Sequence, residues 1–356
     1  MDSLRGIAAA AVMSGHTALA YGIAGVPNHW AVMLFFVLSG LVLALPWIAG
    51  RPLPWPRFLI RRTLRLWPPV IVAILVSAWI NGGHEPVTAG LLGRCLFLTD
   101  QGGGCSRLDD PLWSLVFEAR ISAVFPILIL IILRVRPSIA LVSALAIGFM
   151  VEFRAWELGL DSHGGFTGDG FPFTGSGLLS TISITIHYMA LFIFGILLAA
   201  HGRRAARLDG RHLLAVLVGA IALLCVESDT VKGIGSVLLI AAVIGSDSLR
   251  QALRLAPFRW LGRVSYSLYL IHFPIVMAIA YACGGRLTAG AAVAAIIASG
   301  IAAEIMYRSV EIPSIRLGRW LTKPTAPRLP ASDHSGLYES DDRRPSEGNR
   351  VNTYAV

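Results

Sequence analysis

Long apolar stretches recur along this chain of 356 residues, and they constrain its fold more than any other feature. Each approaches the length of about 20 residues that an α-helix needs to cross a lipid bilayer. Charged residues make up only 14% of the sequence, whereas a soluble domain carries about 25%. The mean hydropathy of +0.67 agrees with this pattern. The sequence therefore predicts an all-α fold, a polytopic bundle of membrane helices.

Ten membrane spans can be drawn through these stretches. They cover residues 4–24, 31–48, 68–81, 112–133, 138–152, 178–200, 212–227, 233–246, 264–283 and 288–308. The first has no small-residue cleavage site, so we expect it to remain in the protein. We expect one transmembrane domain over residues 1–321 and a disordered cytoplasmic tail over the polar residues 322–356. No internal repeat is evident, which disfavours an inverted-repeat transporter.

Arginine is distributed unevenly between alternate loops, and this asymmetry predicts the topology. The arginine-rich loops hold residues 51, 57, 61, 62, 65, 134, 136, 203, 204, 207, 211, 250, 254, 259 and 263. The other loops hold few basic residues and several acids. The positive-inside rule then places both termini in the cytoplasm. The formal net charge of +9 reflects these loops, so we expect a lipid bilayer and no nucleic acid as partner.

The first span carries two polar residues on an apolar helix, Arg5 and His16. Their spacing of eleven residues corresponds to roughly 16 Å of helix and places both on one stripe. A histidine deep in hydrocarbon needs a partner or a function. His16 is either a structural histidine or a general base or acyl carrier. Arg5 is either an anchor at the membrane surface or an anion contact.

A second group of arginines lies between the second and third spans, in PLPWPRFLIRRTLRLWPP. Arg61, Arg62 and Arg65 fall within about one helical turn, and the segment stops at Pro68–Pro69. The pattern fits an amphipathic membrane anchor. It also fits a site for a phosphorylated donor, because guanidinium groups match phosphate oxygens.

The fourth predicted span contains Glu118 and Arg120 at membrane depth, so each should face a partner or water. Counting residues from the outer membrane surface places Glu118 about 9 Å and His16 about 12 Å below that surface, at a similar depth. Glu118 could instead form an ion pair with an arginine.

Other polar residues in the spans favour structural roles. His187 and His272 suit polar links between helices, Glu304 and Glu311 suit pairs with arginines, and Ser39–Gly40 suits close helix contact. Cys95 and Cys105 fall in one predicted outer loop and either form a disulfide or, as we favour, remain unpaired. The four cysteines match no zinc spacing, and no metal is expected.

Six ordered blocks make the chain similar to the acyltransferase-3 family of bacterial integral-membrane O-acyltransferases. They are LRGIAAAAVMSGH, FFVLSG, RRTLRLWPP, PLWSLVFEARISAVFP, LGRVSYSLYLIHFP and YRSVEIPSIRL, within residues 2–319. The resemblance implies that Arg5 and His16 form the family's Arg-x10-His motif with a catalytic histidine, and that Arg62 and Arg65 form an Arg-x-x-Arg motif for the CoA donor. Glu118 matches the glutamate of a third block. That block departs from the family pattern at Val116, Arg120 and Ser122.

The resemblance implies a multi-pass enzyme of the bacterial plasma (inner) membrane. We expect it to move an acetyl or other short acyl group from cytoplasmic acyl-CoA, first of all acetyl-CoA, to a hydroxyl of a cell-surface or exported carbohydrate. Arg5, Arg61, Arg62 and Arg65 are the candidate donor contacts, and His16 and Glu118 the candidate catalytic residues. The alternatives are acylation of a secreted small-molecule glycoside, transport of a lipid-linked sugar, and an inactive binding subunit.

Overall fold

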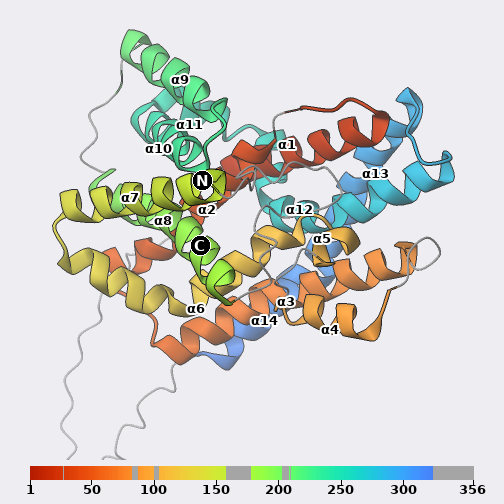
Figure 1. Ribbon diagram of the computed structural model, residues 1–356, viewed down its shortest axis with the longest axis horizontal. Helices are drawn as coiled ribbons and strands as arrows, with labels where there is room; N and C mark the ends of the chain where they lie inside the picture. The colour runs from red at the N-terminus through yellow and green to blue at the C-terminus, as the bar shows by residue number, and fades with distance from the viewer. Residues whose placement is uncertain are drawn as a thin grey trace, which may run out of the picture. The chain divides into compact units, whose positions relative to one another are not determined.

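The computed structural model describes residues 1–26, 28–81, 87–99, 104–157, 178–202, 208 and 210–323. The predicted tail from residue 324 onward and most of the Gly- and Asp-rich loop before the sixth predicted span lie outside the described residues. The described chain up to Thr322 forms one compact unit, and it is helical throughout (Figure 1).

The helices alternate with short connections, as the apolar pattern predicts. Their bounds are α1 Asp2–Tyr21, α2 His29–Ile48, α3 Trp55–Asn81, α4 Ala89–Leu96, α5 Gly104–Leu108, α6 Leu112–Arg134, α7 Pro137–Glu157, α8 Leu178–His201, α9 Gly210–Leu224, α10 Asp229–Gly245, α11 Asp247–Ala252, α12 Ala256–Ala282, α13 Ala289–Met306, a π-helical turn at Tyr307–Glu311, and α14 Ile312–Leu321. In the described part of the chain no residue lies in a β-strand.

Seven helical segments of the described chain are long and apolar enough to cross a membrane. They are His29–Ile48, Trp55–Asn81, Leu112–Arg134, Pro137–Arg154, Ile182–His201, Ala256–Ala282 and Ala289–Leu321. The remaining three predicted spans correspond to α1, α9 and α10, which are shorter or less apolar. The prediction of a multi-pass helical membrane protein is therefore confirmed. The count of ten spans and the cytoplasmic termini remain predictions.

The predicted stop at Pro68–Pro69 differs from the structure. The arginine-rich segment is the first half of α3, which continues through Pro68 and Pro69 instead of stopping there. This half packs against α12 and α14, and Tyr266 of α12 donates a hydrogen bond to the carbonyl of Leu66 at 2.8 Å. Tertiary contacts thus hold a helix through two prolines that alone would interrupt it.

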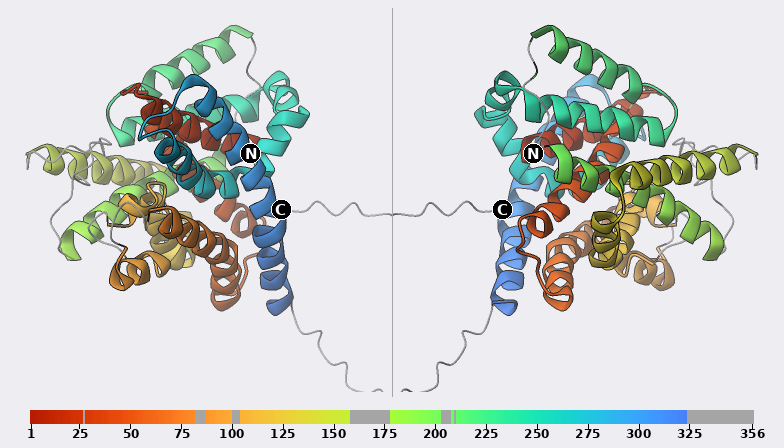
Figure 2. Two further views of the ribbon diagram at one scale, coloured as in Figure 1. Left: turned by 90° about the vertical axis from the view of Figure 1, so that its right-hand side faces the viewer. Right: turned by 90° about the vertical axis from the view of Figure 1, so that its left-hand side faces the viewer.

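Close helix contact positions the helices around the centre of the bundle. α1 packs along α12, and α2 packs along α8 (Figure 1). A methyl group on Gly40 would lie 2.2 Å from the carbonyl oxygen of Phe192, so only glycine allows α8 to approach α2 this closely. The predicted role of Ser39–Gly40 in close helix contact is confirmed for Gly40. At the periphery, α7 packs on α8 and α9 on α10 (Figure 2).

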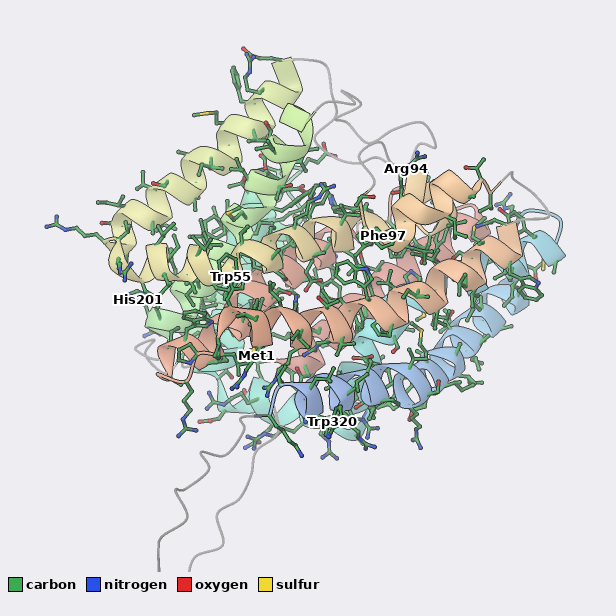
Figure 3. The ribbon with its side chains drawn as sticks, turned by 90° about the horizontal axis from the view of Figure 1, so that it is seen from below. Met1, Trp55, Arg94, Phe97, His201 and Trp320 are labelled. Carbon is green, nitrogen blue, oxygen red and sulfur yellow. A yellow bond between two sulfur atoms is a disulfide. The ribbon has the colours of Figure 1, made fainter. Side chains whose placement is uncertain are left out.

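A disulfide lies in the connection that carries Arg94. In Figure 3, Met1, Trp55 and His201 lie in the left half of the view, and Arg94 and Phe97 in the right half. On the side of Arg94, a disulfide joins Cys95 to Cys105. Our preference for unpaired cysteines was therefore wrong, because α4 and α5 fold back on each other and bring the two side chains together.

Candidate active site

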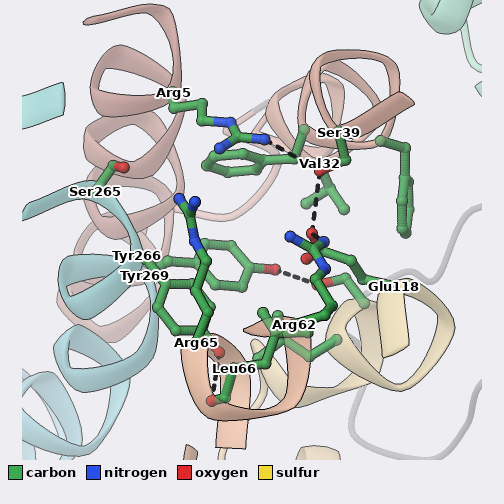
Figure 4. Close-up of a pocket in the computed structure, with 14 residues that line it drawn as sticks. Arg5, Val32, Ser39, Arg62, Arg65, Leu66, Glu118, Ser265, Tyr266 and Tyr269 are labelled. Carbon is green, nitrogen blue, oxygen red and sulfur yellow. Dashed lines mark hydrogen bonds and ion pairs between the residues drawn. The ribbon is translucent and has the colours of Figure 1, made fainter. Parts of the chain in front are cut away.

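A pocket at the centre of the bundle collects charged residues from three helices. Its lining includes Arg5 of α1, Arg62 and Arg65 of α3 and Glu118 of α6 (Figure 4). Most of the other lining residues are apolar or aromatic. Three guanidinium groups against one carboxylate give this lining a surplus of positive charge, which suits an anionic ligand.

Glu118 is the centre of the polar contacts in this pocket. Its Oε1 accepts hydrogen bonds from Ser39 Oγ at 3.0 Å and from Arg62, with which it forms a tight ion pair. Arg62 Nε also donates to Ser122 Oγ at 3.0 Å, and Arg5 donates to Ser39 Oγ at 3.4 Å. Ser39 therefore links the first helix to the Arg62–Glu118 pair. An ion pair with an arginine was one of the two roles that the sequence allowed for Glu118, and the structure shows it with Arg62.

Arg61, a further candidate donor contact, faces another direction. Its Nε donates to Thr322 Oγ1 at 2.5 Å, near the end of α14. It does not line the pocket that Arg62 and Arg65 share. Successive residues of a helix point about 100° apart, so only two of the three neighbouring arginines turn inward.

Ser114 and Tyr269 extend the polar lining away from the arginines. Ser114 on α6 and Tyr269 on α12 both line the pocket, and their hydroxyl groups lie 2.7 Å apart. The Tyr269 ring packs edge-on against Phe35, with ring centres 5.3 Å apart. On the other side Tyr269 lies near His272, with ring centres 6.3 Å apart. This pair of hydroxyl groups thus leads from the pocket toward His272.

His16 is buried and contacts a second histidine and an aspartate. Its Nδ1 lies 2.9 Å from His272 Nε2, and its Nε2 lies 3.1 Å from Asp110 Oδ2. The two imidazole rings are nearly parallel, with centres 5.1 Å apart. Phe273 packs edge-on against His16. The link between helices that we predicted for His272 is confirmed, and its partner is His16.

The turn before α6 places Asp110 against His16. Asn81 Nδ2 donates to the carbonyl of Leu108 at 3.0 Å, and the amide of Asp109 donates to the carbonyl of the disulfide-bonded Cys105 at 2.8 Å. Asp109 is fully buried, and burial together with the neighbouring Asp110 carboxylate raises the pKa of Asp109 well above its ordinary value. Tertiary contacts therefore fold this acidic turn into the bundle.

The structure separates the two residues that we expected to lie at one depth. The carboxylate of Glu118 faces Ser39 and Arg62, whereas His16 faces Asp110. About 12 Å of chain separates Asp110 from Glu118. Through Ser39, Glu118 is linked to Arg5, about three turns of α1 away from His16, so the expected match between Glu118 and His16 is not observed.

The sequence did not identify four residues of this region as candidate site residues, namely Asp110, Ser114, Tyr266 and Tyr269. The adjacent acids Asp109 and Asp110 directly before an apolar span were a usable signal, since such residues rarely lie beside hydrocarbon without a partner. Tyr269 lies three residues before His272 on one helix and therefore on the same face. Ser114 has no comparable signal, because single serines are frequent in membrane helices.

Other titratable residues in the spans have contacts away from the pocket. His187 lies 3.8 Å from Glu152 and 3.9 Å from Asp229, as a link between helices. Glu304 pairs with Arg308, as expected. Glu311 instead accepts a hydrogen bond from Ser267 Oγ at 2.7 Å. Among the described residues, no three His, Cys, Asp or Glu side chains are arranged to hold a metal ion.

Comparison with known proteins identifies the family. A family model described as an acyltransferase domain matches residues 1–306. The chain therefore belongs to the acyltransferase-3 family, and with its apolar helices it is a membrane acyltransferase by family. No curated protein and no solved structure matches it.

Proposed function

We propose that the protein transfers a short acyl group, first of all acetyl, from cytoplasmic acyl-CoA to a hydroxyl of a cell-surface or exported carbohydrate. The observation that carries the proposal is the arginine pocket, whose lining ends at Ser114 and Tyr269, with the buried His16–His272 pair next to the Tyr269 ring. An anion-binding end and a buried histidine at the other end are what transfer from a CoA thioester requires.

The arginine pocket is the proposed donor site. Arg5, Arg62 and Arg65 would bind phosphate oxygens of CoA, because their charge exceeds that of Glu118 and guanidinium groups bind phosphate with two parallel hydrogen bonds. Glu118 would hold Arg62 and Ser39 in position for this contact. The apolar lining would accommodate the pantetheine arm, with the thioester toward Ser114 and Tyr269.

Transfer would take place beside His16. A carbohydrate hydroxyl approaching from the side of the Asp109–Asp110 turn would lose its proton to His16 as its oxygen attacks the thioester carbonyl. Alternatively, His16 would carry the acyl group briefly. With the arginine-rich connections in the cytoplasm, the donor enters from inside and the acceptor from outside.

Release of free CoA by the purified protein tests this function. The protein in lipid nanodiscs would be given acetyl-CoA and polysaccharide from the producing bacterium, and free thiol would be measured. We expect thiol release that requires both substrates and disappears in His16→Ala, with expression unchanged. A transporter of a lipid-linked sugar would release no CoA, and full activity of His16→Ala would contradict the proposed role of His16.

A further inference from the structure

The hydrogen bonds of His272 determine which nitrogen of His16 carries a proton. His272 Nδ1 lies 2.9 Å from the carbonyl oxygen of Leu268. A carbonyl oxygen only accepts hydrogen bonds, so Nδ1 of His272 must be the donor. A neutral imidazole carries one proton, which leaves Nε2 of His272 as an acceptor. His272 is fully buried, and burial disfavours the doubly protonated ring.

The position of the proton on His272 determines the position of the proton on His16, because the two rings share a hydrogen bond. Since His272 Nε2 accepts, His16 Nδ1 must donate across the 2.9 Å separation. The other nitrogen of His16, Nε2, is then the one that can lose or gain a proton, and it lies 3.1 Å from Asp110 Oδ2. These two atoms form no hydrogen bond with each other, but a carboxylate oxygen this close favours a protonated Nε2.

We propose that His272 is a positioning residue that fixes the tautomer of His16, and that His16 Nε2, 3.1 Å from Asp110, exchanges protons together with this carboxylate during acyl transfer. This inference rests on the proposed function. The acceptor oxygen bonds to the acyl carbon and the carbon–sulfur bond breaks. The pair receives the hydroxyl proton and gives a proton to the departing thiolate, so it ends each turnover as it began.

The arrangement favours His16 as an acid–base catalyst over a covalent acyl carrier. Nδ1 is occupied by His272, and an acyl group on Nε2 would displace the Asp110 contact. The titratable groups around His16 are His272 and Tyr269 on α12 and Asp110 and Asp109 in the turn before α6.

Substitutions of His272 separate the tautomer role from packing. His272→Gln keeps an oxygen that can accept from His16 Nδ1, whereas His272→Leu keeps volume without an acceptor. We expect His272→Leu to lower kcat about tenfold or more, with the KM for acetyl-CoA within about twofold, and His272→Gln to recover most of kcat; a tenfold loss equals about 1.4 kcal/mol. His187→Leu is the matched control, because His187 is also a buried histidine that links helices but contacts Glu152 and Asp229, away from the pocket, and we expect its kcat to stay near wild type.

Asp110→Asn provides a second test if His272→Leu fails to fold. It keeps the shape of Asp110 and removes its ability to receive a proton, so we expect a loss of kcat about as large as that of His272→Leu. Wild-type kcat in Asp110→Asn or His272→Leu would overturn the inference, as would equal losses in folded His272→Gln and His272→Leu. Absence of transfer by the wild-type protein would instead overturn the proposed function, and the inference with it.

Discussion

Arg65 and Arg61 are near neighbours on α3 with different surroundings, and this contrast tests the donor site. Arg65 lines the pocket with Arg5 and Arg62, whereas Arg61 contacts Thr322. A hydrogen bond to a charged group contributes about 1.5–3 kcal/mol, and each 1.4 kcal/mol corresponds to about a factor of ten in affinity. We predict that Arg65→Ala raises the Kd for acetyl-CoA by about tenfold or more, measured by calorimetry. Arg61→Ala should leave it within about twofold, and equal effects would contradict the placement of the donor.

The Arg62–Glu118 pair yields a prediction about stability. Arg62 is 9% exposed and pairs with Glu118. Removing one partner of a buried ion pair costs about 3–5 kcal/mol, because the other charge remains buried and uncompensated. Glu118→Gln should therefore lower the melting temperature clearly, and the double variant Arg62→Gln/Glu118→Gln should recover much of the loss. Additive losses in the double variant would show that the two residues do not act as a pair.

At the scale of elements, the disulfide and α5 hold the turn that carries Asp110. Cys95 and Cys105 are separated by 10 residues in the sequence, and closing a loop of this size stabilises the folded state by about 3 kcal/mol. We predict that Cys95→Ser/Cys105→Ser lowers kcat severalfold, because Asp110 then loses its fixed position against His16. The control is Cys225→Ser/Cys283→Ser, which changes the two free, exposed cysteines. Wild-type kcat without the disulfide would contradict its role in positioning Asp110.

The sequence predicted the elements better than the contacts between them. Apolar length determined most helices, since any chain in hydrocarbon must satisfy its backbone internally. The spacing of Arg5 and His16 placed both on one stripe of α1, and both contact other helices, Arg5 at Ser39 and His16 at His272, because helix periodicity is local. The partners of Glu118 and His16 depend on how α6 and the turn before it pack on α2, α3 and α5, with a hydrogen bond from Asn81 and the disulfide holding that turn. Such long-range packing leaves no periodic signal in one sequence.

At the scale of the whole molecule, the free cysteines test the topology. Cys225 follows α9 and Cys283 follows α12, and both are exposed. With cytoplasmic termini, both lie on the outer side of the membrane. We predict that a membrane-impermeant maleimide labels intact cells at both positions, and that Cys225→Ser/Cys283→Ser removes the signal. Labelling only after the cells are opened would reverse the proposed topology and the sides of donor and acceptor.

Transfer of label across the membrane tests the central claim, a path from the arginine pocket to His16. Proteoliposomes of defined orientation would hold radiolabelled acetyl-CoA on the side of the arginine-rich connections and polysaccharide of the producing bacterium on the other side. We predict that label appears in the polysaccharide with the wild-type protein and with Arg61→Ala, and that His16→Ala abolishes the transfer. Label that stays in acetyl-CoA with the wild-type protein, or reaches the polysaccharide equally with His16→Ala, would contradict the account.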